Sequence, residues 1–149
     1  MKTLGSNHDL ESAIPFMLAR AGARMGNSFA KALKPFGLSL SEWRVCASLQ
    51  HLPNQGLTEL AAHIATDLSA LSRIVDRLVA LNMVEREKCN ADGRAVRLAL
   101  SARGVALTLE IVPLAKRYEK VALSDFSADE VKMLRSMLLR LYTNASVLI

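Results

Sequence analysis

Side chains that can bind nucleic acid gather in residues 67–77. Ser69 and Arg73 are four residues apart, so in a helix they share one face, and Ser72 lies beside that face. Hydroxyl and guanidinium groups donate hydrogen bonds to base edges and phosphates, and the major groove of duplex DNA admits a helix. Residues 84–100 add four basic side chains: Arg86, Lys88, Arg94 and Arg97. These residue types favour binding to duplex DNA, although a solvated helix beside an ordinary hairpin would carry the same residues.

Two short helical patterns in tandem would position these side chains. Thr58 can cap the first helix, ELAAHIA, and Asp67 can cap a second helix whose apolar residues recur at i, i+3, i+4 and i+7. The short connection between them is typical of a helix-turn-helix. Asn82, which tolerates a left-handed backbone, is expected to close the second helix.

A β-hairpin is predicted directly after this pair. Val96, Leu98 and Leu100 alternate with Arg97 and Ala99, which is the period of a strand. Turn residues separate two extended arms, and they are Asn90, Asp92 and Gly93. The hairpin would place its arginines beside the second helix.

Helices are predicted on the N-terminal side. The first covers residues 9–34 and stops before Pro35. Its small residues at steps of three or four predict a close approach by another helix, and they are Ala19, Gly22, Ala23, Gly26 and Ala30. Ser39 and Glu42 have capping-box spacing, so a second helix should start there and end before Pro53. It would bury Trp43, Cys46, Ala47 and either Leu49 or Gln50.

Two further helices are predicted after residue 101. Pro113 should kink the first of them or end it early, and the spacing of Ser127 and Glu130 opens the second. The last helix carries more apolar surface than one small core can cover. Such a surface usually meets another subunit.

Composition is consistent with one mainly helical domain. The chain has 149 residues, of which 51% are hydrophobic and only 5% aromatic, so Leu, Ala, Val, Ile and Met must form the core. The net charge of +5 fits an acidic partner. The sequence lacks a strongly basic amphipathic segment, a targeting segment and an apolar membrane span, so we expect a cytoplasmic protein with no membrane partner.

The central sequence resembles the MarR family of transcriptional regulators. The resemblance is carried by SRIVDRL, VER, the D-x-R pattern of Asp92 and Arg94, and LALSARG, and it extends more loosely over the whole chain. It implies a single domain, residues 1–149, with a winged helix-turn-helix lobe at 39–100. Residues 9–34 and 101–149 would form dimerisation helices, so that a homodimer binds a pseudo-palindromic operator. Two departures are Ala65 and Asn82, where the family often has glycine.

The resemblance also assigns residues of the DNA interface. Ser69, Ala70, Ser72 and Arg73 would face the major groove. Arg77 would take a phosphate or pair with the wing, and Arg94 would read the minor groove, with Asp92 orienting an arginine. Positive charge on the hairpin arm would come from Arg86 and Lys88.

Most members of the family resemble repressors that are released by a small ligand, often a phenolic or aromatic carboxylate. The residues that could line such a ligand cleft are Met17, Arg20, Ala23, Arg24 and Trp43. Trp43 is equally consistent with core packing, and the two arginines with solvation or pairing across a dimer.

Other functions have less support in the sequence. Cys46 lies in an apolar helix and is expected to be inert, whereas Cys89 beside Lys88 would be the site of a redox-responsive alternative. The three histidines His8, His51 and His63 lack metal-ligand spacing, so neither a metal nor a cofactor is predicted. A small helical enzyme is the rival class, but the chain lacks a nucleophile elbow and a phosphate-binding glycine loop.

Overall fold

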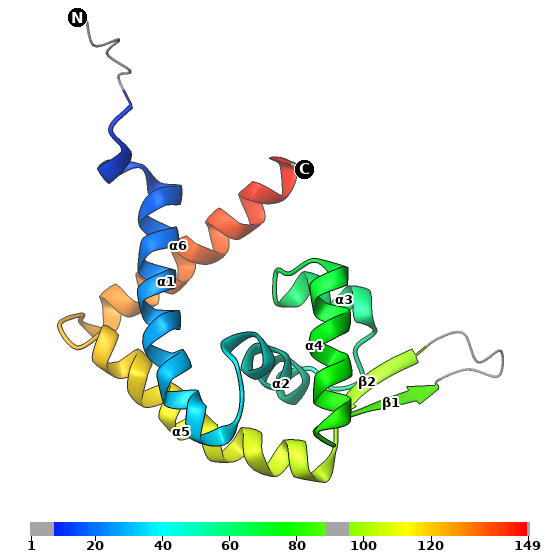
Figure 1. Cartoon of the computed structure of the whole chain (residues 1–149). Helices are drawn as coiled ribbons and strands as arrows, with labels where there is room; N and C mark the ends of the chain where they lie inside the picture. The colour runs from blue at the N-terminus through cyan, green and yellow to red at the C-terminus, as the bar shows by residue number, and fades with distance from the viewer. Residues whose placement is uncertain (1–7, 89–95, 149) are drawn as a thin grey trace, which may run out of the picture. The chain divides into compact units, whose positions relative to one another are not determined.

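The computed structural model describes residues 8–88 and 96–148, which form helices and one two-stranded hairpin (Figure 1). The elements are η1 (Leu10–Ser12), α1 (Ile14–Leu33), η2 (Lys34–Phe36), α2 (Leu40–His51), α3 (Leu57–His63), α4 (Leu68–Ala80), β1 (Val84–Lys88), β2 (Val96–Leu100), α5 (Ala102–Ala122), α6 (Ala128–Ala145) and η3 (Ser146–Leu148). The predicted mainly helical fold with a hairpin is confirmed. The chain divides into two compact units, Met1–Ala115 and Lys116–Ile149, with the boundary inside α5.

The first helix starts later than predicted. Asp9 caps only the short 3-10 turn η1, where its carboxylate accepts a hydrogen bond from the Glu11 amide, and α1 begins at Ile14. The reason is Pro15, which has no amide hydrogen and is tolerated in the first turn of a helix but not in its interior. The predicted stop before Pro35 is confirmed.

The small residues of α1 permit a close approach at one position. A Cβ added to Gly26 would lie 2.9 Å from Leu40 Cδ2 of α2, whereas a Cβ at Gly22 would meet nothing within 4 Å. Phe29 of α1 then contacts Trp43 of α2 edge to face, with ring centroids 5.9 Å apart. The predicted contact between helices is therefore confirmed at the C-terminal half of α1.

The core of the N-terminal unit is aliphatic. Fully buried side chains come from α1 to α4, the hairpin and the first half of α5, and the largest of them include Leu33, Leu49, Leu60, Leu71, Leu78, Met83 and Ile111. Leu49 rather than Gln50 faces this core, which settles the rotation of α2. These contacts hold α4 with its apolar face inward.

A residue with a left-handed backbone conformation lies on each side of α4, one in the preceding turn and one after the helix. Asp67 caps α4 as predicted, since its carboxylate accepts a hydrogen bond from the Ala70 amide at 2.8 Å. Ala65 has φ 54° and Asn82 has φ 58°, which explains why glycine suits both positions. The predicted cap of α3 is wrong: the cap is Gly56 rather than Thr58, so the helix starts one residue before that threonine.

The hairpin pairs antiparallel from Val84 opposite Leu100 to Lys88 opposite Val96. Gln55 adds a single bridge to it, because its carbonyl accepts a hydrogen bond from the Leu98 amide at 2.8 Å. The predicted tip, with Asn90, Asp92 and Gly93, lies outside the described residues.

The C-terminal helices are long, with 21 residues in α5 and 18 in α6. Pro113 lies inside α5 and does not end it, so that alternative is wrong. Ser127 caps α6 as predicted, with its hydroxyl accepting a hydrogen bond from the Glu130 amide at 3.1 Å. No described residue of α6 is buried.

Candidate nucleic-acid interface

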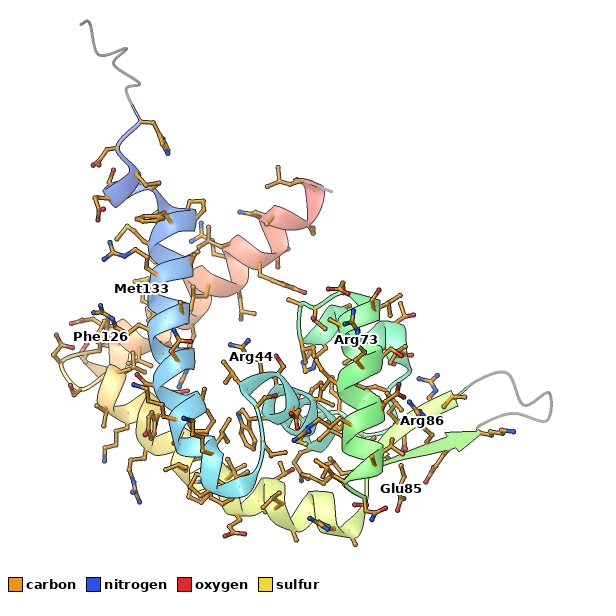
Figure 2. All side chains as sticks on the ribbon, viewed as in Figure 1. Arg44, Arg73, Glu85, Arg86, Phe126 and Met133 are labelled. Carbon is orange, nitrogen blue, oxygen red and sulfur yellow. The ribbon has the colours of Figure 1, made fainter. Side chains whose placement is uncertain are left out.

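Helix α4 has one buried face and one exposed face. Leu71, Val75 and Leu78 are fully buried, so the opposite side of the helix, with Ser69 and Arg73, faces solvent. Ala70 and Ser72 are half-buried beside that side. Figure 2 labels Arg73 on α4. The structure thus brings together four predicted DNA-contact residues on one helix: Ser69, Ala70, Ser72 and Arg73.

One flank of α4 is tied to α2. Arg77 Nε donates to the two carboxylate oxygens of Glu42 at 3.1 and 3.2 Å, and the Glu42 side chain is only 8% exposed. Of the predicted capping box, Ser39 accepts from the Glu42 amide at 3.1 Å, but the carboxylate binds Arg77 rather than returning to the cap. In the described part of the chain Arg77 therefore pairs with α2 and not with the hairpin.

The other flank of α4 is tied to the hairpin. Arg86 of β1, labelled in Figure 2, forms an ion pair with Asp76 of α4, and both side chains are substantially exposed. Arg86 was predicted to contact DNA, and its guanidinium already has a carboxylate partner here. Surface pairs of this kind contribute only about 0–1 kcal/mol, so a phosphate can compete for the arginine.

The hairpin is also tied to α3. Arg97 donates to Glu59 at 2.7 Å and to the Asn54 carbonyl at 3.3 Å. Lys88, at the end of β1, is exposed. The predicted roles of Asp92 and Arg94 concern residues outside those that the structure describes.

Two polar residues of this lobe were missed by sequence reasoning. Gln55 is buried, and its side-chain amide donates to the carbonyls of Ser48 and Leu52 at 3.1 and 2.7 Å while its backbone pairs with β2. The spacing of Glu42 from Ser39 predicts only a capping role and gives no sign of its contact with Arg77. A buried polar residue next to a turn carries no local signal, because its partners are distant in sequence.

The candidate ligand residues do not all share one site. Four of them line an open concavity of about 610 Å³ on α1, and they are Met17, Arg20, Ala23 and Arg24. Arg20 is partly engaged there, because it pairs with Glu11 at 2.8 Å and lies over the Phe16 ring. Trp43 instead packs on Phe29 and borders a different concavity of about 390 Å³ between α2 and α3. In the single chain Trp43 therefore borders a different concavity from the one that the α1 residues line.

The described residues also bear on the redox and metal hypotheses. Cys46 is buried, and burial raises the pKa of its thiol to about 12, as expected for an inert cysteine. Cys89 lies outside the described residues. Within residues 8–88 and 96–148, no three His, Cys, Asp or Glu side chains converge on a possible metal site. Among the described helices, none is long and apolar enough to cross a bilayer.

Comparison with known proteins agrees with this geometry. The model of the MarR family matches residues 38–96. An HTH-type transcriptional repressor of Mycobacterium tuberculosis is 26% identical over 131 residues, which is 88% of this chain and 94% of the relative. A probable transcriptional regulator from Pseudomonas aeruginosa is 28% identical with a TM-score of 0.76, over 89% of this chain and 99% of that one. A MarR/EmrR family regulator from an Acinetobacter species has a TM-score of 0.86 at 20% identity, over 93% and 99% of the two chains.

The fold is that of a winged helix-turn-helix protein. Helix α3 is joined by a tight turn to α4, which has an exposed face, and the β1–β2 hairpin follows α4 directly. Over residues 38–96 the chain matches the MarR family of helix-turn-helix transcriptional regulators. This is a class of DNA-binding proteins and not of enzymes.

Proposed function

We propose that this protein is a homodimeric transcriptional repressor that binds a pseudo-palindromic operator. Helix α4 would enter the major groove, and the hairpin would reach the adjacent minor groove. The observation that carries the proposal is the exposed side of α4, where Ser69 and Arg73 face solvent while Leu71 and Val75 fix the helix from behind. The Mycobacterium relative that is named a repressor supports the direction of regulation.

Dimerisation would place two such helices on one operator. We assign it to residues 9–34 and 101–149, with residues 39–100 as the DNA-binding lobe. Support comes from apolar side chains of α6 that are at least two-fifths exposed, and these are Met133, Met137, Leu138, Leu139, Leu141 and Tyr142. A dimer would also double the net charge of +5 that a single chain carries.

The test begins with duplex DNA selected from a random pool by the full-length protein. Arg73→Ala should weaken binding to the selected duplex by about 1–3 kcal/mol and reduce the salt slope by about 1 if the guanidinium meets a phosphate. Arg44→Ala is the matched control, because Arg44 is an exposed arginine on α2 rather than on α4. Equal losses in both variants, or no duplex binding by the wild type, would overturn the proposal.

The hairpin is tested in the same titration. We propose that Arg94 enters the minor groove, where A·T tracts concentrate negative potential, and that Lys88 contacts the backbone. Arg94→Ala should cost roughly 1–3 kcal/mol of binding free energy. Unchanged affinity would remove the hairpin tip from the mechanism.

The repressor would be released by a small aromatic or phenolic carboxylate. Within the concavity on α1, we assign the carboxylate to Arg24, which is exposed there, while Arg20 already pairs with Glu11. Calorimetry with benzoate and hydroxybenzoates should show binding that Arg24→Ala abolishes, and the same acids should release the selected duplex. Absence of heat with every acid would indicate a repressor that does not respond to this class of ligand.

A further inference from the structure

We propose that Glu42, a buried residue of α2, is a positioning residue of the DNA interface and acts through Arg77 of α4. The inference rests on the proposed DNA-binding function. Glu42 lies behind α4, the recognition helix that we propose enters the major groove, since its side chain is only 8% exposed and contacts Arg77. Glu42 would never touch DNA itself.

The geometry leaves part of the Arg77 guanidinium available. Both contacts from Glu42 are made to Nε, at 3.1 and 3.2 Å, and the Arg77 side chain is 59% exposed. A guanidinium has five N–H donors, and four of these lie on the two terminal nitrogens. Glu42 therefore holds the base of the group and leaves its outer donors free to meet a phosphate.

The same contact also restrains one flank of α4, whose apolar face is already packed inward. Successive helix residues are about 100° apart, so Asp76 and Arg77 lie on opposite flanks of the exposed side, and Arg73 lies between them one turn earlier. Asp76 binds the hairpin and Arg77 binds α2. The Asp76–Arg86 pair is exposed at both ends, whereas the Glu42 carboxylate is buried. The Glu42 pair is therefore the stronger constraint.

Fixing Arg77 before DNA arrives lowers the cost of binding. A free arginine side chain loses rotamer entropy when DNA orders it, and that loss would reduce the affinity. In this protein the ordering is already achieved by folding. Removal of Glu42 should therefore weaken DNA binding without removing any atom that contacts DNA.

The direction of the change in DNA affinity distinguishes positioning by Glu42 from simple electrostatic repulsion. Glu42→Gln removes a negative charge from the DNA-binding lobe, so electrostatics alone predicts tighter binding to DNA. Positioning predicts the opposite, a loss of about tenfold in affinity for the selected duplex, which is the usual scale of coupling between contacting residues. Glu85→Gln is the matched control: Glu85 is an exposed carboxylate of β1, labelled in Figure 2, and its removal should leave affinity unchanged or raise it.

A double-mutant cycle shows whether the effect passes through Arg77. Arg77→Gln should lose the most affinity because it removes the phosphate contact, Glu42→Gln should lose less, and the double variant should lose no more than Arg77→Gln alone. Arg77→Lys keeps the charge but loses the planar group that Glu42 holds, so its affinity should fall while its salt slope stays at the wild-type value. Arg77 is exposed, so this variant tests the idea even if Glu42→Gln does not fold.

Thermal unfolding of each variant establishes that folded protein is being titrated. Wild-type affinity in Glu42→Gln, additive losses in the double variant, or full rescue by Arg77→Lys would each overturn the proposal. If the wild type itself failed to bind duplex DNA, the proposed function would fail instead, so the two failures are distinguishable.

Discussion

The two units of the chain differ in where their apolar side chains lie. In the N-terminal unit, Leu33, Leu71, Leu78 and Ile111 are fully buried within one aliphatic core. In the C-terminal unit, no described residue from 116 to 148 is buried, although α6 is rich in leucine and methionine. The N-terminal unit has an apolar core of its own, although Ile14, Met17 and Leu18 at the start of α1 are exposed, whereas the C-terminal unit leaves its apolar residues exposed.

This difference indicates how each unit is stabilised. Isolated helices of this length are marginal in water, and most of their stability comes from packing an apolar face. The N-terminal unit has such packing for the C-terminal half of α1 and for α2 to α4. The C-terminal unit has an apolar face without a core, and a second copy of the chain would supply the missing surface.

The largest effect should follow from a cavity in the N-terminal core. Leu71→Ala should lower the free energy of unfolding by about 2–5 kcal/mol, because the lost side chain of a fully buried leucine leaves a cavity. Leu139→Ala is the matched change in α6, where the leucine is 67% exposed. Urea unfolding of the isolated chain at low concentration should show less than about 0.5 kcal/mol for this second variant. Equal losses would show that the contrast between the units is wrong.

A charged residue on α6 should affect assembly rather than folding. Met137 is 47% exposed, and Met137→Glu should cost about 1.5–3 kcal/mol of dimerisation free energy if its side chain is buried by a partner. Sedimentation at several concentrations measures that change, and the thermal transition of the N-terminal unit should be preserved. An unaltered monomer–dimer equilibrium would place the subunit interface elsewhere.

The features that sequence predicted correctly are local ones. The caps at Ser39, Asp67 and Ser127 join a side chain to an amide three residues later, so their spacing is visible in the sequence. The left-handed conformation of Asn82 likewise follows from its residue type. The outward side of α4 followed from its apolar period alone.

The features that sequence could not predict are pairings over long separations. Glu42 and Arg77 are 35 positions apart, and the capping-box spacing gave Glu42 a plausible local partner that competes with the real one. Gln55 lies between α2 and α3, and it bridges to Leu98 of β2. Trp43 borders a different concavity from the α1 ligand residues, because side-chain direction in α2 depends on packing against Phe29.

The free energy of unfolding at alkaline pH should show whether water reaches the core of the N-terminal unit. The pKa of Cys46 is raised by burial from 9.0 to about 12, so between these values the unfolded chain loses a proton that the folded chain keeps. Stability from this group is therefore complete below pH 9 and falls as pH rises, by about 1.4 kcal/mol per pH unit. Cys46→Ala removes the contribution of this thiol, so the free energy of unfolding of the variant should fall less steeply above pH 9 than that of the wild type. Parallel curves for the two proteins would show that Cys46 meets water.

The smallest effect concerns an exposed ion pair, and it separates the DNA-binding unit from the other one. Asp76→Asn should change the free energy of unfolding by less than about 1 kcal/mol, because both Asp76 and Arg86 are exposed. It should nevertheless tighten duplex binding roughly two- to fivefold, since it frees Arg86 and removes a carboxylate that repels phosphate.

The Glu119–Arg135 pair, at 3.0 Å, offers the same chemistry in the C-terminal unit. Glu119→Gln should leave the affinity for the selected duplex unchanged, because only the N-terminal unit contains the recognition helix. A fall in affinity with Asp76→Asn would mean that Asp76 holds Arg86 in place for DNA, as we propose Glu42 does for Arg77. The direction of the change in duplex affinity therefore distinguishes two cases: an ion pair that DNA displaces, and an ion pair that holds an arginine in place for DNA.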